Sequence, residues 1–273
     1  MKKIIRKKNF SEIVNFYDIF FFDLYGVTHN GISLFPNIIN IFKKVKAMKK
    51  KIIFVSNAPR QSIKIKNFLK SIGLDQSLYF DVVSSGDITR DDYLVNLKRK
   101  KYFFIGAKKD RDFCKGLKIF EEKKLEKSNF ILNLGLNFGE TVRDYNNILK
   151  QAAKLNLPMI CVNPDLEVIR GKKKEICAGA LALKYEKFGG KVQYYGKPYK
   201  KIYQECLKRI KFNNKKKILA IGDSIRTDIL GAKNFSIDSA LILSGIHKKI
   251  KEIEKICKKT NIYPKFLFNK LEW

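Results

Sequence analysis

Short, continuously apolar runs alternate along this chain with segments in which apolar residues recur every three or four positions. IFFFD (19–23) and KIIFVSN (51–57) have the length and the Phe, Ile and Val content of strands that are buried on both faces. Between these two runs, Pro36 opens a segment with the spacing of one helix face. Its apolar residues are Ile38, Ile39, Phe42, Val45 and Met48. The alternation predicts an α/β fold with parallel strands.

The same rhythm continues to the C-terminus. A helix from about Gln61 to Gly73 is followed by a short strand and loop, DVVSSGD (81–87). Between about 90 and 190 we expect a second α/β unit. Its predicted strands are YFFIG, FILNLG and PMICVN, and its predicted helices lie around 141–156 and 177–188. The later predicted elements are VQYYG, a helix opened by Pro198, KILAIGD (217–223), a helix near 228–235, SALIL and a last helix.

This order of elements predicts a doubly wound, Rossmann-type parallel sheet that carries an inserted α/β domain. We expect residues 1–80 and 191–273 to form the core and residues 81–190 to form the inserted cap. At 273 residues, with 45% hydrophobic residues, the chain is long and apolar enough to bury such a core.

The formal charge of +31 favours contact with anions. The lysines, however, are scattered along the whole chain instead of forming a stripe, and their abundance fits a compositional bias toward AT-rich codons. We therefore expect a small phosphorylated metabolite as the partner, and neither nucleic acid nor membrane. The five cysteines form no CxxC pair, which predicts reduced thiols in a cytoplasmic protein. The apolar run after the basic N-terminus is too short to span a bilayer.

Four predicted strands end in polar residues of the kinds that phosphoryl transfer requires. They are Asp23 after IFFF, Ser56 and Asn57 after IIFV, Lys197 after VQYYG, and Asp223 and Asp228 in ILAIGDSIRTD. Ligands of parallel sheets bind at the carboxyl ends of the strands, so these side chains converge if the four strands are neighbours. One carboxylate can then attack phosphorus, a second can help to hold Mg²⁺, and the lysine and the donors can neutralise the phosphoryl oxygens.

The order and spacing of these residues resemble the haloacid dehalogenase superfamily of hydrolases, whose four motifs can each be matched here. DLYGV, VSNAPR, NPD (163–165), GKP and GDSIRTDI occur in the order of the subfamily, IIA, whose cap lies between motifs II and III. That subfamily includes nitrophenylphosphatase-like and NagD-like phosphatases of sugar phosphates or nucleotides. Within NPD, Asp165 fits a turn residue and a specificity contact equally well.

The resemblance implies a Mg²⁺-dependent phosphatase that hydrolyses a small phosphate monoester through an aspartyl-phosphate on Asp23. It implies that Ser56 and Lys197 bind the phosphoryl oxygens, with Asn57 either joining them or orienting the loop. The metal ligands that it implies are Asp23, the backbone carbonyl of Tyr25, Asp223 and Asp228. The oligomeric state stays open, with a homodimer as one alternative.

Tyr25 departs from the family's usual pattern. In phosphatases of this superfamily motif I reads DxDG, and its second acid protonates the leaving oxygen and later activates water. Removal of a general acid or base costs about 10²–10⁴-fold in rate. Tyr25 can act as an acid if it is well placed, with an ordinary pKa near ~10. His29, four residues on, has a more suitable ordinary pKa, and the sequence leaves open which of the two replaces the missing acid.

Two other functions compete with the phosphatase. DxYG is the form that haloacid dehalogenases show, so a metal-free 2-haloacid dehalogenase is one alternative. Asp223 and Asp228 argue against it, because oxygen ligands of this kind hold a cation. The other alternative is a catalytically weak member of the superfamily that binds a phosphorylated ligand or nucleic acid through its charge.

Overall fold

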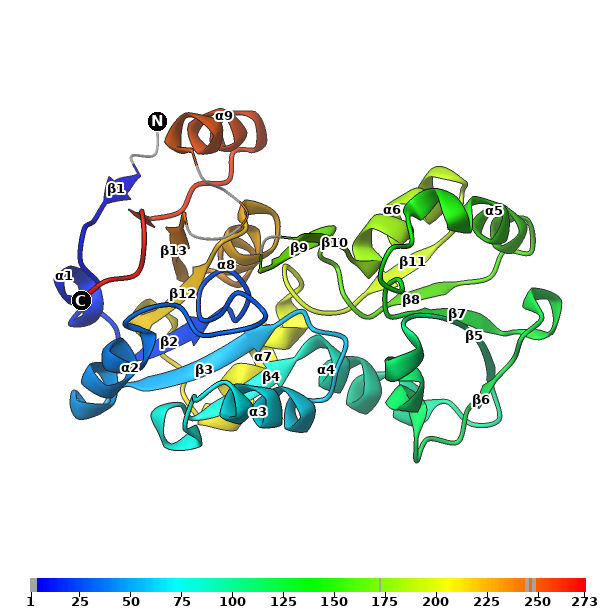
Figure 1. The fold of residues 1–273 in the computed structure, drawn as a ribbon, viewed down its shortest axis with the longest axis horizontal. Coiled ribbons are helices and arrows are strands. Elements are labelled where there is room, and N and C mark those ends of the chain that lie inside the picture. The colour runs from blue at the N-terminus through cyan, green and yellow to red at the C-terminus, as the bar shows by residue number, and fades with distance from the viewer. Residues whose placement is uncertain (1–3, 172, 244–245, 247–248) are drawn as a thin grey trace.

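Two α/β units, each built on a parallel sheet, make up the computed structural model, which describes residues 4–171, 173–243, 246 and 249–273 (Figure 1). The larger sheet has the strand order β1 (Ile5–Arg6), β14 (Phe266–Phe268), β13 (Asp238–Ile242), β12 (Ile218–Gly222), β2 (Ile19–Phe22), β3 (Lys51–Ser56) and β4 (Asp81–Ser84). All of its neighbouring strands pair in parallel. This confirms the predicted parallel α/β fold.

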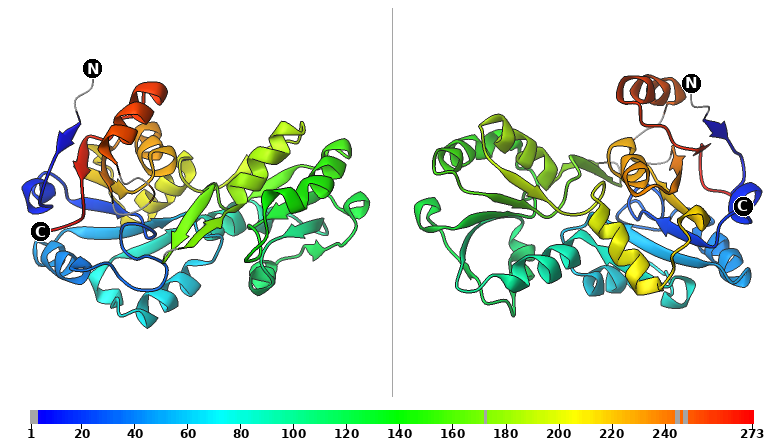
Figure 2. Two further views of the ribbon diagram at one scale, coloured as in Figure 1. Left: turned by 45° about the horizontal axis from the view of Figure 1, so that its top comes forward. Right: turned by 180° about the vertical axis from the view of Figure 1, so that it is seen from behind.

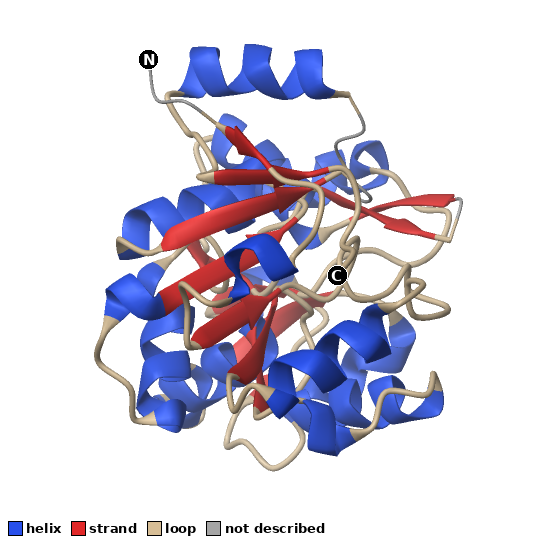
Figure 3. Cartoon of the chain, turned by 90° about the vertical axis from the view of Figure 1, so that its left-hand side faces the viewer, coloured by secondary structure: helices blue, strands red, loops and turns tan. Residues whose placement is uncertain are grey.

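Helices cover both faces of the larger sheet, as Figure 3 shows. The helices of this unit are α1 (Ser11–Val14), α2 (Ile38–Ala47), α3 (Ser62–Ser71), α4 (Ser85–Asp92), α7 (Lys200–Ile210), α8 (Leu230–Phe235) and α9 (Ile250–Thr260). Successive side chains of a strand point to opposite faces. In β2, Phe20 and Phe22 pack with α1, α2 and α3, whereas Ile19 and Phe21 pack with α7 and α8. Burial on both faces explains why the strand is apolar at every position.

The second unit is the cap. Its five-stranded sheet has the order β11 (Val192–Tyr194), β8 (Met159–Cys161), β7 (Phe130–Asn133), β5 (Lys101–Ile105) and β6 (Phe120–Glu121). Helices α5 (Asn146–Lys154) and α6 (Ala178–Lys187) bury one face of it. A separate antiparallel hairpin, β9 (Glu167–Arg170) with β10 (Lys173–Ile176), extends from the cap toward the core, as Figures 1 and 2 show.

The chain passes between the two sheets later than the predicted boundaries at 80 and 190. The run DVVS forms β4, which is hydrogen-bonded to β3 and so belongs to the core sheet. VQY forms β11, which pairs with β8 and so belongs to the cap sheet. Strand pairing decides whether such a short segment belongs to the core sheet or to the cap sheet. The apolar pattern of the segment does not show which strand it pairs with.

Every predicted helix lies close to its expected position. The hairpin β9–β10, the short strands β1, β6 and β14, and the helices α1 and α4 are additions that the apolar pattern did not predict. Helix α4 begins at Ser85, where a loop was expected. All five cysteines are buried and none forms a disulfide. Within the described ranges, no helix has the length and apolar character needed to cross a membrane.

Candidate active site

Three neighbouring strands of the core sheet bring polar side chains to one edge. β12, β2 and β3 lie side by side in the sheet. Asp23 follows β2 directly, Asp223 follows β12, and Ser56 is the last residue of β3. The parallel direction of the strands therefore places these three side chains at the same carboxyl-terminal edge.

Lys197 reaches this edge from the other unit. The expectation that the strand before it neighbours β2, β3 and β12 is wrong, because β11 pairs with β8 of the cap. Lys197 lies instead in the segment that leads from β11 back to α7 in the core. Its Nζ lies 2.6 Å from Oδ1 of Asp23 and 2.7 Å from Oδ1 of Asp228, and its side chain is only 4% exposed.

Asp23, Asp223 and Asp228 form a compact carboxylate cluster, in which one oxygen of each lies within 4.8 Å of the others. Asp223 accepts a hydrogen bond from the backbone N–H of Ile246 at 2.9 Å, and Asp228 accepts one from Ser224 at 3.2 Å. The π-helical turn Ile225–Ile229 carries Asp228 back toward the sheet edge. These backbone contacts orient the carboxylates before any ligand binds.

Gly222 makes room for this arrangement. A Cβ atom on Gly222 would lie 2.0 Å from Cγ of Asp228, far inside van der Waals contact. Only glycine therefore lets Asp228 approach the end of β12, and this gives the glycine of the GDS motif a steric role in the cluster.

The cluster shifts the proton affinity of its members. Burial raises the pKa of Asp23, with added repulsion from Asp228 and Asp165, while Lys197 opposes the shift. Burial also raises the pKa of Asp223 well above its usual range. For Lys197, burial works against the charge, but the carboxylates around it outweigh that effect and raise its pKa well above the usual range. The lysine is therefore held as the ammonium ion.

The donor set suits a divalent cation. One ammonium faces three carboxylates, which leaves negative charge uncompensated in a buried site. Carboxylate oxygens are the ligands that Mg²⁺ prefers, and a bound cation relieves their mutual repulsion.

Asn57 links the core, the cap and the lysine segment. Its Oδ1 accepts from the backbone N–H of Lys197 at 2.6 Å, and its Nδ2 donates to the backbone oxygen of Lys197 at 3.1 Å. The same Nδ2 donates to Oδ1 of Asp165 in the cap at 2.9 Å. Through these contacts Asn57 orients the backbone of Lys197 and the carboxyl group of Asp165. A contact of Asn57 with phosphate stays a prediction. Neighbouring Ser56 accepts a hydrogen bond on Oγ from the N–H of Ala58 at 3.2 Å.

Tyr25 and His29 lie on different sides of the cavity wall. Tyr25 lines the cavity, and a Cβ atom on Gly31 would lie 3.0 Å from its hydroxyl and 3.0 Å from Cγ of Arg170. His29 is 1% exposed, does not line the cavity, and packs between the rings of Tyr25 and Phe68. Burial lowers the pKa of His29 to about 4. The alternative that His29 supplies the missing acid is therefore unsupported, since the ring is buried outside the cavity.

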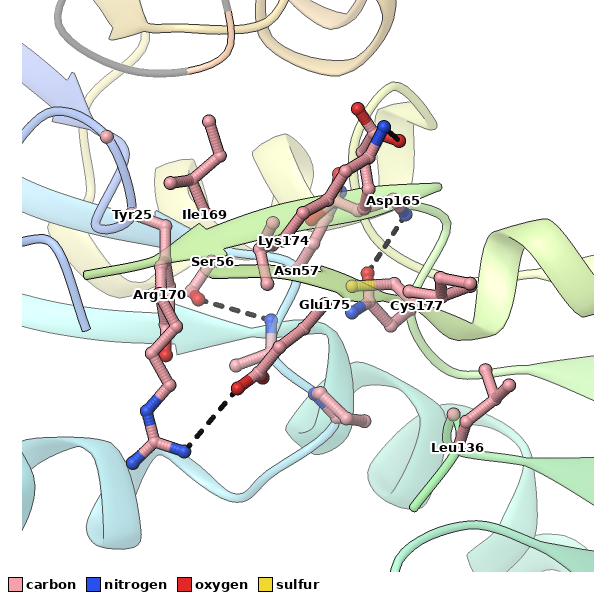
Figure 4. A pocket seen from close by; sticks show the side chains of 18 of the residues that line it. Tyr25, Ser56, Asn57, Leu136, Asp165, Ile169, Arg170, Lys174, Glu175 and Cys177 are labelled. Carbon is pink, nitrogen blue, oxygen red and sulfur yellow. Dashed lines mark hydrogen bonds and ion pairs between the residues drawn. The ribbon is translucent and has the colours of Figure 1, made fainter. Parts of the chain in front are cut away.

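The cavity above the carboxylate cluster has a volume of about 820 Å³ and is lined by both units. The cap contributes the hairpin β9–β10 and the loop 134–140, neither of which the sequence marked as functional. Figure 4 shows Arg170 and Glu175 of the hairpin, together with Tyr25 and Ser56 of the core, among the residues that line the cavity. The backbone N–H of Gly171 donates to the carbonyl of Asn30 at 2.8 Å, which joins the hairpin tip to the core. The signal that could have revealed the hairpin is EVIRGKKKEI, two short segments around a glycine.

Comparisons with known proteins agree with this fold. The family model described as haloacid dehalogenase-like hydrolase matches residues 20–119, and the model described as HAD-hydrolase-like matches residues 194–272. The crystal structure of a hydrolase of the haloacid dehalogenase-like family from Brucella suis 1330 superposes with a TM-score of 0.87 and 30% identity, covering 97% of this chain and 99% of that one.

Two curated proteins are also similar along most of their length. The 4-nitrophenylphosphatase of Schizosaccharomyces pombe is 24% identical over 93% of both chains. The ribonucleotide monophosphatase NagD of Escherichia coli is 27% identical over 71% of this chain and 75% of its own.

The chain belongs to the haloacid dehalogenase-like family of hydrolases. The cap is inserted after β4 and α4, downstream of Ser56 at the end of β3, and before the segment that carries Lys197. This is the arrangement of subfamily IIA.

Proposed function

We propose that this protein is a phosphatase that hydrolyses a small phosphate monoester with the help of Mg²⁺. The observation that carries the proposal is the contact of Asp23 with Lys197 inside the buried carboxylate cluster, at the floor of a cavity between core and cap. The two curated relatives, both named as phosphatases, support it.

Asp23 is the proposed nucleophile. Its carboxylate oxygen attacks phosphorus, the bond from phosphorus to the leaving oxygen breaks, and the product is an aspartyl-phosphate that water then hydrolyses. Lys197 already lies within 2.6 Å of Asp23, so its ammonium is placed to neutralise a phosphoryl oxygen. Ser56 ends the adjacent strand β3 and offers its hydroxyl at the same edge.

Asp23, Asp223, Asp228 and the backbone carbonyl of Tyr25 are the proposed ligands of Mg²⁺. When bound, the ion supplies positive charge that offsets the repulsion between a phosphate dianion and the carboxylates. Because every residue type has a backbone carbonyl, tyrosine at position 25 leaves this ligand set intact.

The same cluster argues against the two alternatives. The three buried carboxylates, with one oxygen of each within 4.8 Å of the others, repel one another unless a cation binds. The reaction of a metal-free dehalogenase does not require such a cation site. Binding of a phosphorylated ligand does not require a carboxylate such as Asp23 in contact with Lys197, because the carboxylate repels the phosphate. Halide release from 2-haloacids without metal would favour the dehalogenase, and tight, steeply salt-dependent oligonucleotide binding would favour the binding protein.

The test is phosphate release from p-nitrophenyl phosphate and from a panel of phosphorylated metabolites, with Mg²⁺ and with EDTA. We expect Mg²⁺-dependent turnover in the wild type and a loss of about 10⁴-fold or more in Asp23→Asn. Asp18→Asn is the matched control, because Asp18 precedes the other end of β2 and its side chain is 50% exposed. The absence of turnover on every ester would overturn the proposal.

A further inference from the structure

Asp165 is a carboxyl group of the cap that lines the same cavity as the proposed nucleophile, Asp23. It follows β8 in the segment NPD. The charge of Asp165 raises the pKa of both Asp23 and Lys197, so the three groups interact electrostatically. Yet Asp165 belongs neither to the carboxylate cluster nor to the contacts of the lysine ammonium.

Two hydrogen bonds hold the segment of Asp165 against the core. Nδ2 of Asn57 donates to Oδ1 of Asp165 at 2.9 Å, and Arg226 donates to the carbonyl oxygen of Pro164 at 2.6 Å. The carbonyl of Asp165 also accepts the N–H of Gly179 at the start of α6, at 3.1 Å. Figure 4 shows Asp165 and Asn57 among the residues around the cavity. The carboxyl group is therefore fixed in position although it comes from the other unit.

One oxygen of this carboxyl group is left for a ligand. Within the described ranges, Oδ1 is engaged by Asn57 and Oδ2 accepts no hydrogen bond and faces no ion-pair partner. Each of the other acids that line the cavity outside the carboxylate cluster pairs with a cation or with a tyrosine hydroxyl, whereas Asp165 has only the amide of Asn57 as a side-chain partner within the described ranges. These pairs are Asp110 with Arg60, Glu167 with Lys174, Glu175 with Arg170, and Glu140 with Tyr145 and Asn137.

The surroundings of Asp165 favour a protonated carboxyl group. Burial raises its pKa, and the carboxylate of Asp228 adds to this, while Lys197, the hydrogen bond from Asn57 and Arg226 oppose it. The remaining titratable groups that face it are Asp23 and the thiols of Cys161 and Cys177. A raised pKa favours the protonated form, and a protonated carboxyl group can serve as a general acid.

We propose that Asp165 is the general acid and base of this enzyme, in place of the acid that tyrosine replaces at position 25. As the oxygen of Asp23 bonds to phosphorus, Oδ2 of Asp165 gives its proton to the departing oxygen, which leaves as an alcohol. In the second step the Asp165 carboxylate takes a proton from water as that water attacks the aspartyl-phosphate. The step releases phosphate, restores the Asp23 carboxylate and returns the proton to Asp165.

The position of Tyr25 fits this assignment. Its hydroxyl lies where the hairpin tip meets the core, next to Gly31 and the stem of Arg170. Asp165 therefore supplies, from the cap, the general acid that motif I of the core lacks. Because Asn57 holds Asp165 across the boundary between the units, proton transfer depends on a cap that is closed on the core.

The inference rests on the proposed phosphatase function and is tested with two substrates whose leaving groups differ strongly in how much they need an acid. p-Nitrophenolate leaves without a proton, whereas an alkoxide does not. For Asp165→Asn we expect the first turnover of p-nitrophenyl phosphate to stay within about threefold of the wild type. We expect the first turnover of an alkyl phosphate such as glycerol phosphate to slow by about 10²–10⁴-fold. Steady-state turnover falls on both substrates, since water activation is lost.

Rapid mixing with nitrophenolate absorbance and quenched phosphate release measures these rates. The nitrophenolate released in the first turnover also shows that the variant is folded. Asp110→Asn is the matched control, another carboxyl group of the same cavity, and its effect is expected to be equal for the two substrates. An equal loss of first-turnover rate on both substrates in Asp165→Asn would assign the residue to cap positioning, and no loss on the alkyl phosphate would also overturn the inference. Failure of the wild type on these two substrates and on every other ester of the panel would instead refute the phosphatase function.

Discussion

Nζ of Lys197 lies 2.6 Å from Oδ1 of Asp23, although one residue follows a strand of the cap and the other a strand of the core. The ammonium also contacts Asp228 at 2.7 Å, and Asp223 completes a cluster in which carboxylates outnumber the ammonium. The site thus combines the proposed nucleophile, the ammonium proposed to bind phosphate and surplus negative charge. That surplus leads to the first prediction.

Magnesium should stabilise the folded protein through this cluster. Binding to the folded state alone adds RT ln(1 + [L]/Kd), which is about 2.7 kcal/mol at a concentration of 100 Kd. We expect Mg²⁺ to raise the Tm of the wild type and to raise that of Asp223→Asn much less, because one of the three carboxylates is lost. Differential scanning fluorimetry measures this, with NaCl at matched ionic strength as the control for screening. An equal rise in both proteins would place the ion elsewhere.

Gly222→Ala should damage the cluster without touching a charged side chain. The new Cβ atom would collide with Asp228, whose Cγ lies 2.0 Å from the position of that atom. We expect turnover to fall by about 10²-fold or more and the Mg²⁺ concentration for half-maximal rate to rise, because Asp228 must move.

Gly189→Ala provides the comparison for that variant. Gly189 has a φ of +86°, and a Cβ atom there would meet no atom within 4 Å. It should lose about 1 kcal/mol of stability from its backbone conformation and keep its turnover. A Gly222→Ala protein with normal turnover would contradict the packing around Asp228.

An acid restored to motif I should compensate for the loss of Asp165. In the Asp165→Asn background we expect Tyr25→Asp to raise the first-turnover rate on an alkyl phosphate by about tenfold or more, since it returns a carboxyl group to the cavity wall. Tyr25→Asn in the same background is the control, because it removes the ring in the same way without adding an acid. Equal rates in the two double variants would count against proton transfer as the missing function.

Low pH should weaken the contact between β4 and α7. Burial works against the Asp81 carboxylate, but hydrogen bonds from Lys66 and Arg209 outweigh it and hold the pKa of Asp81 below its usual value. A group whose pKa is lowered on folding stabilises the protein above its unfolded pKa, near ~3.9, and loses that contribution as the pH falls through the folded value.

We therefore expect Asp81→Asn to lower the free energy of unfolding by about 1–2 kcal/mol at pH 7. The difference from the wild type should shrink below about pH 4. Urea unfolding at several pH values measures it. Asp112→Asn is the exposed control, with an ion pair to Lys64 but a side chain that is 51% exposed. A difference for Asp81→Asn that is independent of pH would refute the electrostatic origin.

The local pattern of the chain was enough to predict the core of the site. Continuously apolar runs identified β2, β3 and β12 as buried strands, and a parallel sheet collects the residues that follow such strands at one edge. Asp23, Ser56 and Asp223 could therefore be named in advance. Asp228 could be named because it is only five residues beyond Asp223.

Contacts between distant segments could not be predicted in this way. Asn57 and Asp165 are 108 residues apart and meet only because the cap closes on the core. The burial of His29 depends on Phe68 of α3, and β11 belongs to the cap only because it pairs with β8. The periodicity of apolar residues predicts whether a segment is buried. It does not predict which other segment packs against it. The sequence therefore determined which residues lie at the ends of the strands, and the tertiary structure decided which of them meet.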